Sequence, residues 1–183
     1  MTDILTKTDE PRNFLNIPIV GDITSGSTHV PQISKEEFAA LLKPVLDHPD
    51  VHCIGWRQYT PYFNDGETCE FSAHQVWLVT KNDLEQYKYL DENDPYMVEE
   101  DLAVGSERHP TLGGRPCHWD DESRRWLYED YRGEHRALYD AANALDGAIQ
   151  SGKSDHVLLD LFGDHCQVVV YKDKIEVERF SHD

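Results

Sequence analysis

Apolar residues are spaced along residues 51–80 in the way that an antiparallel hairpin requires. Two segments, 51–59 and 69–80, are rich in β-branched, aliphatic and aromatic residues, and they flank a turn-forming Asn64-Asp65-Gly66. In the second segment apolar side chains recur at alternate positions, which is typical of a half-buried strand. The residues expected to share its buried face are Cys69, Phe71, Ala73, Trp77 and Val79.

The last part of the chain predicts a second hairpin. Residues 165–172 and 175–180 are strand-like and flank a two-residue turn. Within the second of these segments Ile175 and Val177 alternate with two glutamates. This alternation predicts that both aliphatic side chains are buried and that the outer face of the strand is acidic.

Residues 34–46 have the periodicity of an amphipathic helix. Ser34 and Glu37 form a capping box at its start, and apolar residues then recur at helical spacing. Pro44 lies within this pattern and cannot donate a backbone hydrogen bond. We therefore expect a kink at Pro44 or an early end of the helix.

Two further helices are predicted in the second half of the chain. Apolar residues seven apart indicate a long helix from about residue 121 to residue 151. His135 falls on its apolar stripe, where a buried, hydrogen-bonded histidine is the default role and a pH-sensitive or ligand role is the alternative. A short helix should follow, capped by Ser154 and ended by Gly163.

This order of elements predicts an α+β fold. Two helix-then-hairpin units suggest an antiparallel sheet of at least four strands with the helices packed on one face. Residues 1–33, which contain several prolines and glycines, are expected to form an extended N-terminal arm. Residues 34–183 then form a single domain, with an acidic, loop-rich insertion at about residues 81–120.

The net charge of the chain indicates which classes of partner it can bind. It has 35 acidic against 17 basic residues, a formal net charge of −18. Such a field repels phosphate groups, which argues against direct nucleic-acid binding and against attraction to anionic membranes. A protein with a basic surface is the expected partner, although acidity that serves only solubility is the alternative. No secretory signal or membrane span is recognisable, so a cytoplasmic location is expected.

The most specific candidate site is the aromatic loop at the tip of the first hairpin. Exposed aromatic side chains bury much area at little entropic cost when a partner binds. The alternative is that Tyr62 and Phe63 fold back into the core. The residues predicted to contact a partner are Tyr59, Tyr62, Phe63, Asn64, Asp65 and Glu67.

No complete catalytic or metal-binding motif is present. The four cysteines form no CxxC pair and are expected to be reduced thiols. A zinc site built from Cys117, His118, His109 and either Cys53 or Cys69 lacks the spacing of a zinc module, so no metal or cofactor is assigned. The residues considered for a small metal-dependent hydrolase are Asp65, Glu67, His74, Cys117 and His118.

The hairpin segment WRQYTPYFNDGETCEFS resembles one in uncharacterised proteins of bacteriophages and bacteria. The resemblance covers this motif alone and implies a phage or bacterial setting, with no activity attached. The function expected from the sequence is non-enzymatic binding of another macromolecule, for example by a phage accessory or inhibitory protein that mimics DNA. A metal-dependent hydrolase and a structural subunit of a homo-oligomer, formed by edge pairing of a hairpin, are the two alternatives.

Overall fold

The computed structural model describes residues 13–14, 17–18, 30–63, 66, 69–86 and 101–180. The helices are α1 (Lys35–Asp47), α2 (Lys81–Gln86), α4 (Arg136–Gln150) and α5 (Asp155–Phe162). The strands are β1 (Asn13–Phe14), β2 (Ile17–Pro18), β3 (Val51–Tyr59), β4 (Ser72–Thr80), β5 (Cys117–Asp120), β6 (Arg125–Tyr128), β7 (Cys166–Tyr171) and β8 (Ile175–Arg179).

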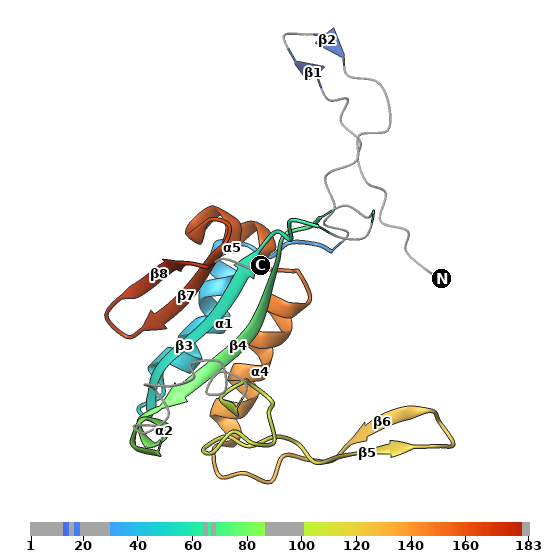
Figure 1. The fold of residues 1–183 in the computed structure, drawn as a ribbon, viewed down its shortest axis with the longest axis vertical. Coiled ribbons are helices and arrows are strands. Elements are labelled where there is room, and N and C mark those ends of the chain that lie inside the picture. Colours follow the sequence, from blue (N-terminus) through green and yellow to red (C-terminus); the bar gives the residue numbers. More distant parts are fainter. Residues whose placement is uncertain are drawn as a thin grey trace.

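The main sheet confirms the predicted α+β class. It has the strand order β4-β3-β7-β8, and every pair in it is antiparallel. The two predicted hairpins supply the four strands, and the central pair, β3 and β7, joins them. Figure 1 shows α1, α4 and α5 on one face of this sheet. The core lies between these layers, where Trp56 and Ile54 of β3 pack with Leu145 of α4 and Leu158 of α5.

Helix α1 forms as its capping chemistry predicts. The Ser34 side chain accepts a hydrogen bond from the backbone of Glu37, and the Glu37 carboxylate accepts one from the backbone of Ser34 at 2.7 Å. The helix continues to Asp47 with Pro44 inside it. Of the two expected outcomes at Pro44, a kink or an early end, the early end is wrong, because packing of the apolar face on the sheet and on α4 outweighs the loss of one hydrogen bond.

A bulge in β4 changes which of its side chains face the core. Between Gly55 and Arg57 of β3 the pairing advances by three residues on β4, from Trp77 to His74. Ala73 belongs to the core cluster on the helix side, whereas the Trp77 ring lies against the opposite face at Gly55. Both are buried, but the prediction that they share one face is wrong, since simple alternation ignores the extra residue.

The two edges of the sheet differ. At the β4 edge, the backbone of residues 102–104 bonds to the strand, with Leu78 N donating to Leu102 O at 3.1 Å. At the other edge, β8 pairs with no further strand within the described ranges. Ile175 and Val177 are 51% and 48% exposed there, so their predicted burial is wrong. They face the helix side, but the helices do not extend over this edge strand.

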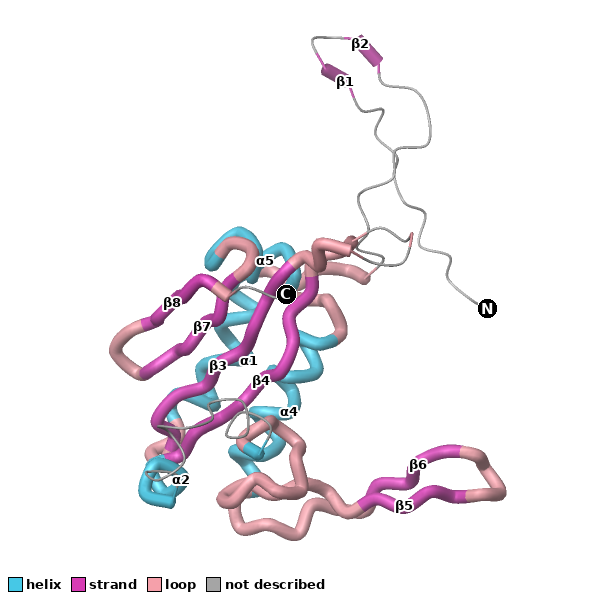
Figure 2. Tube along the Cα trace, viewed as in Figure 1, coloured by secondary structure: helices cyan, strands magenta, loops and turns pink. Residues whose placement is uncertain are grey.

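The predicted long helix begins later than expected. Residues 117–128 form a two-stranded hairpin, β5–β6, and α4 starts only at Arg136 with His135 as its N-cap residue. Figure 2 shows this hairpin extending away from the sheet and the helices. The heptad-like spacing was misleading here, because tryptophan and tyrosine favour strands and the polar run between β5 and β6 forms a turn. His135 therefore lies outside the apolar stripe of α4.

The remaining elements are close to prediction, with one change in capping. Gly152 has φ of +74° after α4, and Gly163 has φ of +82° at the end of α5, as helix-terminating glycines do. Ser154 precedes α5, but its hydroxyl donates to Ala148 O at 3.2 Å rather than capping the helix. The expected side-chain cap is thus replaced by a bond that joins α5 to the end of α4.

The predicted arm lies mostly outside the described residues, and so does the middle of the predicted insertion. Of residues 1–29, only the paired strands β1 and β2 are described. Residues 30–33 lead into α1, and Ile33 N donates to Lys153 O at 2.9 Å. Residues 87–100 are not described, whereas Leu102 and Leu112 of the following segment are buried. Within the described ranges, no helix is long and apolar enough to cross a bilayer.

Candidate functional site

The aromatic loop predicted from the sequence exposes two rings. Tyr62 is 69% exposed and Phe63 is 77% exposed, so neither folds back into the core. The Tyr62 ring stacks on His165 with centroids 4.8 Å apart and planes 14° apart. The predicted contact residues Asn64, Asp65 and Glu67 lie outside the described residues.

Tyr59, the remaining predicted contact residue, belongs to the sheet. It is half-buried at the end of β3, and its ring lies 5.2 Å from that of His74 and 5.7 Å from that of Phe180. Thr60 N donates to the Asp164 carboxylate at 2.9 Å. This bond fixes the base of the loop to the turn between α5 and β7, so Tyr59 positions the exposed pair and is not exposed with it.

A second and larger group of exposed aromatic residues lies on the β5–β6 hairpin. Trp119 and Trp126 are opposite each other in the register, with ring centroids 5.7 Å apart in an edge-to-face arrangement. They are 47% and 55% exposed, and Tyr128 is 59% exposed. The Arg115 guanidinium lies 5.6 Å from the centroid of the Tyr128 ring. The sequence did not predict this surface, because Trp126 and Tyr128 were assigned to the long helix and Trp119 to the loop-rich insertion before it.

The thiols and imidazoles considered for zinc or hydrolase chemistry do not come together. Cys117 and His118 are exposed on β5, whereas Cys53 is buried in β3, where burial raises its thiol pKa to about 12. His109 is buried and bonds through Nε2 to Leu78 O at 2.9 Å, and burial lowers its pKa. His74 bonds to the Ser72 hydroxyl. Within the described ranges these residues form no metal-ligand group.

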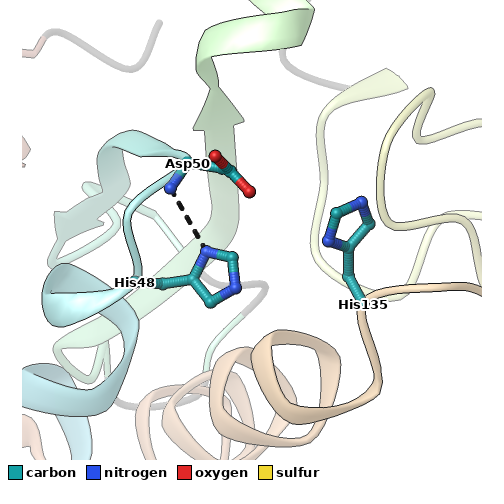
Figure 3. A group of neighbouring side chains, drawn as sticks. All are labelled: His48, Asp50 and His135. Atoms are coloured by element: carbon teal, nitrogen blue, oxygen red, sulfur yellow. Dashed lines mark hydrogen bonds between the residues drawn. The ribbon is translucent and has the colours of Figure 1, made fainter.

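Three other residues do form such a group. One ligand atom each of His48, Asp50 and His135 lies within 4.8 Å of the other two. The two imidazole rings are half-buried with centroids 6.2 Å apart, and Asp50 is exposed. Figure 3 shows the two rings and the carboxylate around a common space. The three residues come from the end of α1, the loop before β3 and the start of α4.

The backbone beside each of these side chains is held by hydrogen bonds. His48 O accepts from Val51 N at 3.2 Å and from the Lys172 ammonium at 2.8 Å. Asp50 O accepts from Lys81 N at 2.8 Å, and His135 O accepts from Tyr139 N at 2.9 Å. The three side chains are thus carried by anchored positions.

Two members of this group, Asp50 and His135, also border a polar cleft. It has a volume of about 320 Å³ and is lined by Asp50, Thr80, Lys81, Asn82, Glu85, Thr111 and His135. Its floor is rigid, because the buried Asp83 carboxylate accepts hydrogen bonds from Thr80 N at 2.7 Å and from the Thr111 hydroxyl at 2.6 Å. Lys81 and Glu85 supply charges of both signs at the rim.

No protein-family model, curated protein or solved structure matches this chain. The candidate sites are therefore interpreted from the residues of this chain alone. The sequence contains one signal that could have indicated the histidine group, since His48-Pro49-Asp50 places two ligand types two residues apart at a helix end. Its third member, 85 positions further along the chain, is brought close only by the packing of α1 against α4.

Proposed function

We propose that this protein acts by binding another protein, and that the β5–β6 hairpin is the principal contact. The observation that carries the proposal is the exposed Trp119–Trp126 pair with Tyr128 beside it. Tryptophan and tyrosine are the residues most enriched among those that dominate binding energy at interfaces. An isolated two-stranded ribbon is at best marginally stable in water, and covering by a partner would stabilise it.

Charge supports a partner with a basic surface. The chain carries a formal net charge of −18. The turn of the hairpin adds Asp120, Asp121 and Glu122 at its tip, next to Arg124 and Arg125. Hydrogen bonds from Ser123 lower the pKa of the Asp120 carboxyl, which keeps it ionised. A chain of this net charge that carries an exposed aromatic ribbon complements a basic surface that contains an apolar pocket.

The tip of the β3–β4 hairpin is proposed as a second, smaller contact. Tyr62 and Phe63 are the most exposed large apolar residues among those described. Mimicry of DNA toward a DNA-binding protein is one form of this function, and a phage or bacterial cytoplasm is the setting that the hairpin resemblance implies. The homo-oligomer alternative now concerns β8, because residues 102–104 occupy the β4 edge.

A comparison of variants tests the proposal. Immobilised wild-type protein and a Trp119→Ala/Trp126→Ala variant would be exposed to the same bacterial lysate at low and at high salt. A matched control is Ile175→Ala/Val177→Ala, which removes a similarly exposed apolar pair from β8. We expect specific proteins of basic isoelectric point to be captured by the wild type and the control, and lost with the tryptophan variant or at high salt.

Two results would contradict the proposal. If the tryptophan variant and the wild type capture the same proteins, the β5–β6 hairpin is not the contact. If capture does not weaken between low and high salt, binding is not driven by charge, and DNA mimicry is rejected with it. Charge-driven complexes weaken as screening increases. A further variant, Tyr62→Ala/Phe63→Ala, assigns or excludes the second contact in the same assay.

A further inference from the structure

We propose that His48, Asp50 and His135 bind one zinc ion, with at least one coordination position open toward the cleft lined by Lys81 and Glu85. Two imidazoles and a carboxylate are a common ligand set of zinc sites that retain an open position. Calcium and magnesium prefer oxygen ligands alone, so two nitrogen donors favour a transition metal. This inference is independent of the proposed protein-binding surface, which lies on another part of the chain.

The distances require only a small adjustment. The three ligand atoms lie within 4.8 Å of one another. Around a tetrahedral zinc ion with bonds of about 2.1 Å, ligand atoms are separated by roughly 3.4 Å. Side-chain rotations that move each ligand atom by about 1 Å close this difference. The anchored backbone at each position does not have to move.

The side chains have few competing interactions. The Asp50 carboxylate makes no hydrogen bond or ion pair with any residue that the structure describes. The His135 side chain makes no capping hydrogen bond with α4, although it occupies the N-cap position. His48 Nδ1 accepts only a long hydrogen bond of 3.4 Å from Asp50 N. Metal coordination would therefore replace weak contacts rather than break strong ones.

The open side of the site determines what kind of metal centre this is. Structural zinc sites are usually closed by four protein ligands, whereas three protein ligands leave a position for water or another ligand. Asp50 and His135 both line the cleft of about 320 Å³, which places that position next to Thr111 and the charged rim. The geometry thus corresponds to an accessible site rather than a buried structural one.

Metal titration of the untagged protein tests the inference. Protein freed of metal by chelation and kept reduced would be titrated with Co²⁺, followed through its visible absorption, and then with Zn²⁺ in competition. We expect one equivalent to bind. His48→Ala and His135→Ala should each weaken binding by more than about tenfold, because each removes one of three ligands. Asp50→Asn, at an exposed position, is the variant least able to disturb folding.

Two matched controls separate this site from adventitious binding. His156→Ala removes an exposed histidine of α5, and Cys117→Ser removes the exposed thiol of β5. Neither should change the affinity for Co²⁺ or Zn²⁺. Persistence of binding in His48→Ala/His135→Ala, loss of binding in Cys117→Ser, or no binding to the wild type would each overturn the proposal.

The pH dependence of binding gives a readout that does not depend on variants. Protons compete with a metal for imidazole at lower pH than they do for a thiolate, so a histidine site should lose affinity only as the solution becomes acidic. A site that contains a thiolate would already lose affinity below about pH 8.5. A decline that begins near the thiol range would therefore refute the histidine site even if one equivalent binds.

Discussion

The buried carboxylate of Asp155 destabilises the folded state. Asp155 is the first residue of α5 and only 7% exposed, and its Oδ1 has no hydrogen-bond partner in the described structure. Burial raises its pKa to about 6, the negative charge of Glu70 adds to this shift, and His156 opposes it. We predict that Asp155→Asn stabilises the protein at neutral pH.

The magnitude follows from the shift. The pKa rises from 3.8 in the unfolded chain to about 6 in the folded one, so ionisation at neutral pH costs the folded state about 3 kcal/mol. Because the folded state binds the proton more tightly, this cost is absent below about pH 3.8, grows as the pH rises, and is complete above about pH 6. The helix N-terminus favours a negative charge by about 0.3–1 kcal/mol, which the variant gives up. The expected net gain at pH 7.5 is about 2 kcal/mol.

Urea unfolding between pH 5 and pH 8, followed by circular dichroism, measures this effect. The free energy of unfolding of Asp155→Asn should exceed that of the wild type by an amount that increases by about 1 kcal/mol over this range. Asp160→Asn, an exposed acid on the same helix, is the control for the loss of one negative charge. A difference between Asp155→Asn and the wild type that stays constant or shrinks as the pH rises would refute the reasoning.

Three further predictions concern the core and can be checked by chemical denaturation. Gly55→Ala should destabilise by about 1–3 kcal/mol, because its Cβ would lie 2.4 Å from the Trp77 ring. Gln58→Leu should cost at least about 1–3 kcal/mol, since the buried amide accepts from Trp56 Nε1 at 2.9 Å and its loss leaves that donor unpaired. His109 has a lowered pKa, so its contribution is complete above about pH 6.5 and is lost as the pH falls below that value; replacing it should remove this part of the acid sensitivity.

The sequence was sufficient to predict the sheet because each hairpin is locally encoded. The limits of β3 were predicted correctly, and those of β7 and β8 were within one residue, since alternation and turn residues lie within a few positions of each other. The face of Trp77 was not predictable by the same rule, because a bulge adds one residue without any distinctive sequence. The exposure of Val177 was also missed, because alternation indicates the face of a strand but not whether a helix covers it.

The candidate sites were predictable to different degrees. Tyr62 and Phe63 could be named as candidates from the sequence because an aromatic-rich turn is a local feature, but the sequence left open whether they are exposed or part of the core. The Trp119–Trp126 pair was missed, since Trp126 was assigned to a helix and Trp119 to the loop before it, and only the antiparallel pairing brings the rings together. His135 was considered as a ligand, but its neighbour His48 comes from a helix end more than 80 positions away. Such a group depends on tertiary packing that no local pattern contains.

Among the residues that the structure describes, the two edges of the sheet differ in whether a further strand can be added. Backbone groups of residues 102–104 occupy the β4 side, whereas on the β8 side Ile175 and Val177 flank Glu176 on a strand whose outer amides and carbonyls pair with no other described strand. The acidic residues on this strand would repel a second acidic strand while leaving a basic one free to add. For protein engineering, a graft, a reporter strand or a designed peptide ligand therefore belongs next to β8, and its sequence should carry lysine or arginine opposite Glu176 and Glu178.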